Sequence, residues 1–217
     1  MVGFRDPRKA PSKSHLRTPP GVWVQASATG YYGDTGDRLY DETAPNGDDT
    51  LAQVCRDWEQ ALEAVNAPGL RRVVLRIGFV LGQEGGALPV LARVTKLFLG
   101  GAAGSGRQFI SWIHLADVAR MFVSAVNNEA LAGIYNAVAP EPVTNAVFMR
   151  ELRHALHRPW SPPAPALAVK LGAQLMGTEG SLALMSQRCS AKKILGTGFQ
   201  FRFPELAAAL GDLCRNS

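Results

Sequence analysis

The sequence QASATGYYGD, at positions 25–34, places a serine hydroxyl and two phenols close together. It follows the apolar run GVWV, which predicts a buried strand, and ligands of parallel sheets bind outside the carboxyl ends of the strands. Ser27, Tyr31 and Tyr32 are therefore candidate catalytic residues. The alternative is structural: Ser27 would close the strand and cap the turn at Gly30, and one of the two tyrosines would pack in the core.

A glycine-rich stretch, GGAAGSGRQ at 100–108, is a second candidate site. Backbone N–H groups of such a loop can cradle a phosphate, and Arg107 would add a positive charge and a fork of donors. Arg107 and its neighbour Gln108 are therefore candidate substrate-binding residues. The alternative is that these glycines only turn the chain.

His114 and Asp117 lie where a short strand pattern leads into a helix pattern. His114 is a candidate acid/base and substrate-binding residue, although a single histidine at such a position more often makes a structural hydrogen bond. Asp117 is expected to cap the helix. The sequence shows no metal-ligand spacing, so we predict no metal site.

Composition and charge narrow the class of protein. The chain has 217 residues, 47% of them hydrophobic, and a net charge of +5. Residues 1–17 account for +4 of that charge, so the remaining part is close to neutral, which argues against a nucleic-acid-binding face. No apolar run reaches the ~18 residues of a membrane span, and three widely separated cysteines fit a reducing compartment, here the cytoplasm. The basic, proline-containing segment 1–18 is expected to be a disordered tail.

Strand and helix patterns alternate along the rest of the chain. Apolar runs predict strands, and apolar stripes at helical spacing predict helices. The expected strands are 21–26, 71–82, 109–114 and 133–139, and the expected helices are 48–65, 85–99, 117–128 and 145–157, with further helical pieces towards the C-terminus. This alternation indicates an α/β fold with a parallel sheet.

Two charged residues are predicted within these regular elements. Arg76 lies inside a strand pattern, where a buried charge requires a partner, and Asp41 or Glu42 is expected to supply it. Glu59, next to Trp58, is expected to pack and orient the helix that carries both residues.

The glycine fingerprint of a dinucleotide-binding sheet, G-x-G-x-x-G between a strand and a helix, does not occur in the sequence. The glycines of the stretch 100–108 have a different spacing and precede a strand. The order and spacing of SATGYYGD, CRDWEQAL, RIGFVLGQEGGAL, GSGRQFISWIHLADVAR, YNAVAPEPVTN and GFQFRFPELAAAL nevertheless resemble the epimerase-family branch of the extended short-chain dehydrogenase/reductases, over about residues 19–213.

This resemblance implies a truncated Rossmann-like parallel sheet with a small C-terminal substrate domain. It divides the chain into the tail over 1–18, a partial Rossmann or epimerase-like domain over 19–157, and a C-terminal helical module of unknown role over 158–217. The part of the family fold that holds the pyrophosphate loop has no counterpart here. We expect a truncated gene or a misassigned start; a partner that supplies this part is the alternative.

The resemblance also sets expectations for the chemistry. In the wider superfamily a Ser or Thr ends this strand, a Tyr transfers the proton, and a Lys four residues later activates the Tyr and holds the nicotinamide ribose. Here Leu51 and Cys55 occupy the positions of that pair and are expected to pack. Ser27 keeps its place as a catalytic and cofactor contact, Gly78 joins it as a cofactor-binding residue, and one of the paired tyrosines is expected to replace the lost acid.

The leading interpretation is a fragment of an NAD(P)-dependent epimerase or oxidoreductase that carries the substrate half of the site and is inactive alone. NADP is the cofactor that the family implies, but we do not expect this chain to bind it, because the glycine loop is absent. The alternative is a non-catalytic module that binds a phosphorylated small molecule or nucleotide sugar, and a third is a scaffold that pairs through an open sheet edge. A small-molecule substrate is the expected partner, rather than nucleic acid or a membrane.

Overall fold

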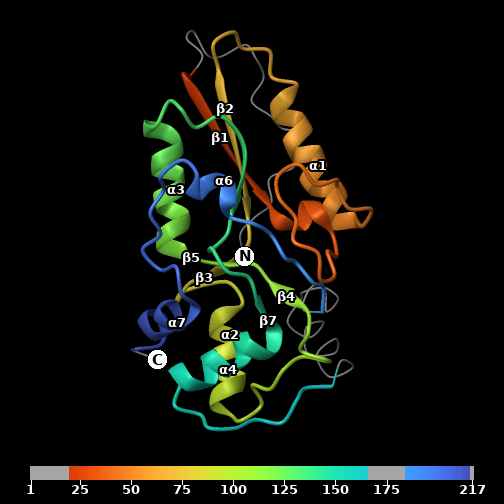
Figure 1. The fold of residues 1–217 in the computed structure, drawn as a ribbon, viewed down its shortest axis with the longest axis vertical. Helices are drawn as coiled ribbons and strands as arrows, with labels where there is room; N and C mark the ends of the chain where they lie inside the picture. Colours follow the sequence, from red (N-terminus) through yellow and green to blue (C-terminus); the bar gives the residue numbers. More distant parts are fainter. Residues whose placement is uncertain (1–19, 166–183, 216–217) are drawn as a thin grey trace.

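The fold is an α/β arrangement around a parallel sheet, as the alternation of strand and helix patterns predicts (Figure 1). The computed structural model describes residues 20–165 and 184–215. The tail expected over 1–18 lies outside these residues, and so does part of the C-terminal module expected over 158–217.

The main sheet has three parallel strands in the order β1–β2–β6. They are β1 (Val22–Ala28), β2 (Arg71–Ile77) and β6 (Gly133–Ala137). The residues from Val73 to Arg76 in the central strand are all buried, whereas most of β1 is half-exposed. Because the three strands run in one direction, their carboxyl ends lie at the same end of the sheet.

Two short strand pairs continue the sheet towards the C-terminal helices. β3 (Phe79–Leu81) pairs in parallel with β5 (Trp112–His114), and β4 (Phe109–Ile110) pairs antiparallel with β7 (Val143–Thr144). The strands predicted over 71–82 and 109–114 are thus each broken, at Gly78 and at Ser111. The two breaks touch, because a Cβ at Gly78 would collide with the carbonyl oxygen of Ser111.

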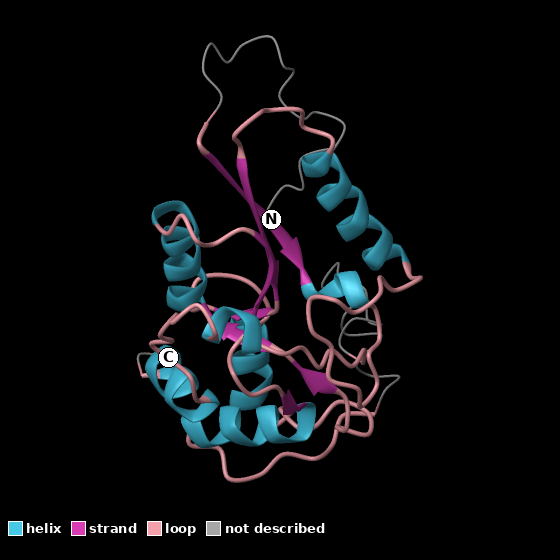
Figure 2. Cartoon of the chain, turned by 45° about the horizontal axis from the view of Figure 1, so that its top comes forward, coloured by secondary structure: helices cyan, strands magenta, loops and turns pink. Residues whose placement is uncertain are grey.

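Helices α1 (Thr50–Glu63) and α3 (Leu115–Asn127) lie on opposite sides of β1 and β2, and both views show this arrangement (Figures 1 and 2). The apolar stripe predicted for α1 faces inwards, with Cys55 and Leu62 among its buried residues. Asp49 caps this helix, accepting a hydrogen bond from the backbone N–H of Ala52 at 2.8 Å.

A second group of helices lies at the lower end of Figure 1. It comprises α2 (Leu88–Lys96), α4 (Asn145–Ala155) and α7 (Leu206–Cys214), which enclose an apolar core of their own around Phe148, Leu152 and Leu210. The short helix α6 (Lys192–Leu195) instead packs beside β6. Among the described helices, none combines the length and the apolar character needed to cross a bilayer.

The start of α3 differs from the prediction. His114 is its N-cap, and its Nδ1 accepts a hydrogen bond from the backbone N–H of Ala116 at 3.0 Å. Asp117 is fully buried and accepts from the backbone N–H groups of Arg202 at 2.7 Å and Phe203 at 2.9 Å. The prediction that Asp117 caps the helix was wrong, because its carboxylate anchors the C-terminal segment instead.

Candidate functional site

Ser27 lies near the carboxyl end of β1 and faces α1. Its hydroxyl donates a hydrogen bond to Glu59 Oε1 at 2.7 Å, and both side chains are buried. Glu59 follows Cys55 by one turn on the buried stripe of α1. A carboxylate on such a stripe requires partners, and Ser27 is one of them.

Arg76, in the central strand, is the second partner of Glu59. Its Nε donates to Oε1 at 2.9 Å and its Nη2 to Oε2 at 2.7 Å, which makes the pair bidentate. The guanidinium is 2% exposed, so the two charges neutralise each other inside the protein. Burial alone would lower the pKa of Arg76, but its hydrogen bonds to Glu59 and Tyr32 raise it, and the group stays charged.

The predicted partners of Arg76, Asp41 and Glu42, make other contacts. Asp41 Oδ1 accepts from the hydroxyl of Thr43 at 2.6 Å and from its backbone N–H at 2.9 Å, which holds the pKa of Asp41 below its usual value. Glu42 Oε1 accepts from the backbone N–H of Asn136 at 2.7 Å. The prediction was wrong because the packing of α1 against the sheet, and not the loop, brings a carboxylate to Arg76.

The structure distinguishes the two candidate tyrosines. The hydroxyl of Tyr32 accepts from Arg76 Nη1 at 2.9 Å and donates to Asn136 Oδ1 at 2.8 Å. Burial raises the pKa of Tyr32 above its usual value, although Arg76 acts in the opposite direction, so Tyr32 stays a neutral phenol within this network. Both hydrogen-bonding directions of its hydroxyl are thus occupied by protein groups.

Tyr31 is only half-buried, and its ring lies over the guanidinium of Arg76, with 3.4 Å between the ring centroid and Cζ. It also contacts the edge of the Tyr32 ring, at a centroid distance of 5.4 Å. Within residues 20–165 and 184–215, no protein group forms a hydrogen bond with the Tyr31 hydroxyl. Tyr31 is therefore the tyrosine whose phenol is free to meet a ligand.

Leu51 and Cys55 pack, as their place on the apolar stripe predicts. Leu51 lies against Gly30, where a Cβ would come within 2.5 Å of its Cδ2. Cys55 is fully buried, and burial raises the pKa of its thiol to about 11. At neutral pH it is therefore a protonated, packed thiol without a charge.

Gly78, the other predicted cofactor-binding residue, joins β2 to β3. Its backbone N–H donates to the carbonyl oxygen of Ala137 at 3.1 Å, and it passes close to Ser111 and Val138. This close approach explains why the position is a glycine. Its contact with a cofactor stays a prediction.

The glycine-rich loop over 100–108 is held by its own chain. The backbone N–H groups of Ala103, Gly104 and Gly106 donate to Asn145 Oδ1, the Ala164 carbonyl oxygen and the Ala103 carbonyl oxygen, at 2.8, 2.9 and 3.0 Å. These N–H groups are not free to cradle a phosphate.

The two substrate-binding candidates of that loop differ in exposure. Arg107 is exposed, and within the described part of the chain its guanidinium has no hydrogen-bond acceptor. Gln108 is half-buried and its Nε2 donates to the Ala103 carbonyl oxygen at 3.0 Å. Substrate binding by these two side chains stays a prediction, and it depends on Arg107 rather than on the loop backbone.

His114 is enclosed between α3 and α7. Beyond its capping bond, its Nε2 lies 3.5 Å from Asp212 Oδ2, and its ring stacks on Phe203 with centroids 4.0 Å apart. Burial lowers the pKa of His114, although Asp212 acts in the opposite direction, so the ring is neutral at pH 7. Both ring nitrogens face protein groups, and substrate binding by His114 stays a prediction without a geometric counterpart.

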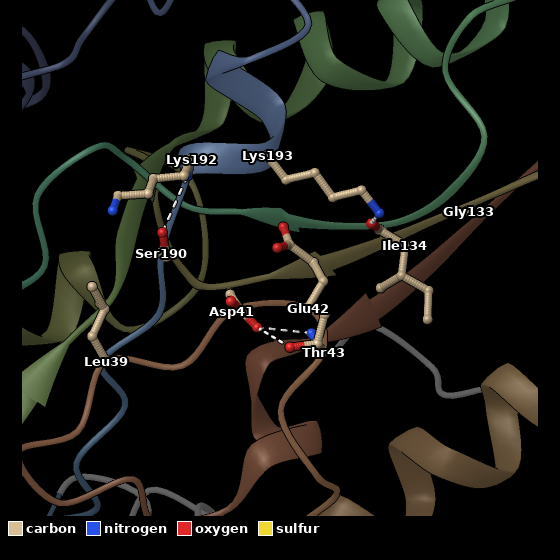
Figure 3. A pocket seen from close by; sticks show the side chains of 9 residues that line it. All are labelled: Leu39, Asp41, Glu42, Thr43, Gly133, Ile134, Ser190, Lys192 and Lys193. Atoms are coloured by element: carbon tan, nitrogen blue, oxygen red, sulfur yellow. Dashed lines mark hydrogen bonds between the residues drawn. The ribbon is translucent and has the colours of Figure 1, made fainter.

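A hollow of about 590 Å³ lies along the outer side of β6 (Figure 3). It is lined by Leu39, Asp41, Glu42, Thr43, Gly133, Ile134, Ser190, Lys192 and Lys193. Several of its polar groups bond to each other: Lys193 Nζ donates to the Ile134 carbonyl oxygen at 2.6 Å, and the backbone N–H of Lys192 donates to Ser190 Oγ at 3.2 Å. Side chains that line this hollow bond to backbone groups at the β6 edge, and its lining shares no residue with the group around Ser27.

The candidate site is therefore the buried polar group at the carboxyl end of the main sheet, made by Ser27, Tyr31, Tyr32, Glu59 and Arg76. The sequence predicted the hydroxyl and phenols but missed the two charged residues as members. A signal was present: a carboxylate on a buried helix stripe and an arginine in a buried strand each require a partner. The arrangement holds the ring of Tyr31 in place and leaves its hydroxyl without a hydrogen-bond partner among the described residues.

Comparison with known proteins matches residues 164–213 to a domain of unknown function (DUF1731). An epimerase family protein of Mycobacterium leprae is 37% identical over 211 residues, which cover 95% of this chain and 68% of that protein. A chloroplastic homologue in Arabidopsis thaliana is 37% identical over 191 residues, 88% of this chain and 54% of its own length. The chain thus spans between about half and two thirds of the length of these relatives.

Solved structures agree with the sequence relatives. The human epimerase family protein SDR39U1, solved with NADPH, superposes with a TM-score of 0.85 at 35% identity, over 94% of this chain and 68% of the human chain. The UDP-glucose 4-epimerase of Thermus thermophilus, solved with NAD, has a TM-score of 0.65 at 21% identity and shares the Rossmann-like fold. By these identities and coverages, the chain belongs to the epimerase family.

Proposed function

We propose that this chain is the substrate-side part of an NAD(P)-dependent epimerase-type oxidoreductase and is inactive without a cofactor-binding part. The observation that carries the proposal is the place of Ser27 and Tyr31 at the carboxyl end of β1. Within the described residues, β1 has a strand neighbour on one side only. A further part of the sheet can therefore join directly beside the candidate site, and the greater length of the relatives supports the same idea.

The residues of this chain do not fit the whole cofactor. The pyrophosphate of a dinucleotide is bound by a glycine-rich turn between a strand and a helix, and the sequence contains no such turn. The other glycine loop uses several of its N–H groups within the chain. We therefore propose NADP as the cofactor of the assembled enzyme and no measurable binding by this chain alone.

The side chains present suit the proton-transfer half of such a reaction. Interconversion of an alcohol and a carbonyl moves a proton as well as a hydride, and a positioned phenol can carry that proton. Tyr31 offers the free hydroxyl, and Arg76 holds its ring. The hydroxyl of Ser27 donates its hydrogen bond to Glu59, so its oxygen can still accept one from a substrate hydroxyl. The substrate is thus proposed to be a small, hydroxyl-bearing molecule, with or without a phosphate group.

The cysteines support a reducing compartment, such as the cytoplasm, as the place of action. Cys55, Cys189 and Cys214 are all free and buried.

The test compares NADPH binding to two proteins by calorimetry. One is the 217-residue chain, and the other is the same chain extended by the cofactor-binding part of the human family protein. We expect binding only by the extended protein, because only that protein has the pyrophosphate turn. A micromolar dissociation constant for the chain alone would contradict the proposal. In the extended protein, Tyr31→Phe should keep NADPH binding and lose turnover.

The alternative is a non-catalytic module that binds a phosphorylated small molecule or nucleotide sugar, and the exposed guanidinium of Arg107 favours it. In that case UDP-glucose is held at the glycine loop, so Arg107→Ala weakens its binding to the chain by about tenfold to a hundredfold without lowering the melting temperature. Arg107→Lys should restore only part of the affinity, because Lys lacks the planar fork.

A further inference from the structure

Residues 186–190, SQRCS, lie within the domain of unknown function and ahead of α6. We call this segment the strap. In Figure 1 it is the blue chain that passes beside the orange loop following η2, the 3₁₀ turn over Thr29–Tyr32. Both candidate tyrosines lie in η2, so the strap, which holds the loop after η2, also helps to fix their position.

On one side the strap is bonded to the loop after η2. The backbone N–H of Thr35 donates to the Ser186 carbonyl oxygen at 2.8 Å, and the N–H of Arg188 donates to Thr35 Oγ1 at 2.9 Å. Tyr40 N–H donates to the Arg188 carbonyl oxygen, and Ser190 N–H donates to the Tyr40 carbonyl oxygen, both at 2.8 Å.

On its other side the strap is bonded to the segment that carries β4 and β5. The backbone N–H of Gln187 donates to the Phe109 carbonyl oxygen at 2.9 Å. The hydroxyl of Ser111 donates to the Gln187 carbonyl oxygen at 2.9 Å and accepts from the N–H of Cys189 at 2.8 Å. The strap therefore lies between two segments like an added strand, and both main-chain groups of Gln187 are bonded to the segment that carries β4 and β5.

The side chain of Gln187 points to the carboxyl end of β1. Thr29, the first residue of η2, is 2% exposed, and its hydroxyl donates to Gln187 Oε1 at 2.7 Å. Gln187 itself is half-buried. No acceptor within residues 20–165 and 184–215 receives a hydrogen bond from its Nε2. Thr29 thus fixes the carboxamide oxygen of Gln187, while the NH₂ group of the same carboxamide can still donate hydrogen bonds to a ligand.

We propose that the strap completes the ligand site of the proposed oxidoreductase and that Gln187 is a ligand-positioning residue, donating from Nε2 to an uncharged hydroxyl or carbonyl oxygen of the substrate. The inference rests on the proposed function, because it needs a substrate at the carboxyl end of β1. It assigns a role to one part of the domain of unknown function: the segment braces the loop after η2 and adds a neutral donor next to Thr29, which lies between Ser27 and Tyr31 along the chain.

The first experiment needs no ligand. In the ¹⁵N-labelled chain, the side-chain NH₂ resonance of Gln187 is assigned by its disappearance in Gln187→Glu. We expect this NH₂ group to be rigid in the parent, as judged by its heteronuclear NOE, and mobile in Thr29→Val, which keeps the shape of Thr29 and removes its hydroxyl. A Gln187 NH₂ group that is already mobile in the parent overturns the proposal.

The second experiment titrates the chain with UDP-glucose and, separately, with inorganic phosphate. Gln187→Glu replaces the two donors by acceptors and should weaken UDP-glucose binding at least tenfold while leaving phosphate binding unaffected. The control is Gln200→Glu, the same change at an exposed position of the C-terminal segment, which should bind as the parent does.

The outcomes separate the two proposals. UDP-glucose binding that is equal in the parent and in Gln187→Glu overturns the role of Gln187 and leaves the proposed function standing. Weakening by Arg107→Ala but not by Gln187→Glu places the ligand at the glycine loop and also overturns the inference. If the parent binds neither probe, the proposed substrate-side function fails, and the role of Gln187 fails with it.

Discussion

The two outer strands of the main sheet, β1 and β6, differ in whether other parts of the chain cover their free edges. Along β6, side chains from other segments occupy the edge: Glu42 accepts from the backbone N–H of Asn136, and Lys193 donates to the carbonyl oxygen of Ile134. These contacts satisfy backbone groups that would otherwise pair with another strand. The β6 edge is therefore closed by the chain itself.

Along β1 the arrangement is different. Within the described residues no strand lies on its outer side, and the indole of Trp23 and the carboxamide of Gln25 bond only within the strand, at 3.3 Å to each other and at 3.0 Å to the Ala26 carbonyl oxygen. An edge of this kind can receive a further strand. Within the described residues, the main sheet is thus covered at β6 and open at β1, the strand that carries Ser27.

The two edges are joined by one buried network. It runs from Ser27 through Glu59, Arg76 and Tyr32 to Asn136, whose Nδ2 also donates to the Ser190 carbonyl oxygen at 3.2 Å.

The largest effect is expected from Arg76→Met, which removes the cation that joins the two edges. Glu59 would remain buried without its partner, and breaking a buried ion pair in this way lowers the free energy of unfolding by about 3–5 kcal/mol. Urea denaturation of the purified chain measures it. The control is Arg150→Met, at the exposed pair with Glu151, which should change the unfolding free energy by less than about 1 kcal/mol. Equal effects of the two substitutions would show that the network does not stabilise the sheet.

Opening the β6 edge should have an intermediate effect. Glu42→Ala leaves the backbone N–H of Asn136 without an acceptor, which costs about 1–3 kcal/mol of unfolding free energy. It should also make the chain associate in a concentration-dependent way, as sedimentation velocity would show. Glu42→Gln keeps an acceptor oxygen and should resemble the parent. If Glu42→Ala stays monomeric and as stable as the parent, the closure of the β6 edge does not depend on Glu42.

A charge on the open edge should affect association rather than stability. Gln25→Lys places a positive charge on β1, a device that discourages strand pairing. We expect the unfolding free energy to change by no more than about 0.5 kcal/mol. Binding of the cofactor-binding part of the human family protein, supplied as a separate polypeptide, should weaken about tenfold, or about 1.4 kcal/mol. Gln200→Lys is the control, and equal binding by both variants would place the junction elsewhere.

The smallest effect is expected away from both edges, at His114. Burial lowers its pKa in the folded state, so the unfolded chain binds the proton more readily, although Asp212 and Asp117 oppose this and Arg202 adds to it. The stabilising contribution is complete above the ordinary histidine pKa of about 6.5 and is lost as the pH falls below it. His114→Asn keeps an acceptor for the backbone N–H of Ala116 and does not titrate, so between pH 7.5 and 5.5 the parent should lose more stability than this variant in urea denaturation. Parallel losses would show that His114 does not titrate differently in the two states.

The regular elements were largely predictable from the sequence. The apolar stripe predicted α1, and the alternation of patterns predicted the parallel sheet, because periodicity depends on neighbours along the chain. The breaks at Gly78 and Ser111 were not predicted. They depend on the close contact between two segments that are distant in the sequence, and the residues of either segment carry no local sign of it.

The sequence by itself determined the α/β class and the position of Ser27 and the tyrosines at a strand end, and it predicted that Leu51 and Cys55 pack. Only the tertiary structure decided that Arg76 pairs with Glu59, 17 positions away, and that Thr29 bonds to Gln187, 158 positions away. It also decided that Tyr32 is occupied while the hydroxyl of Tyr31 is free. The physical reason is that a hydrogen bond or ion pair depends on which side chains the packing of strands and helices brings within about 3 Å, and that depends on the whole fold rather than on neighbouring residues.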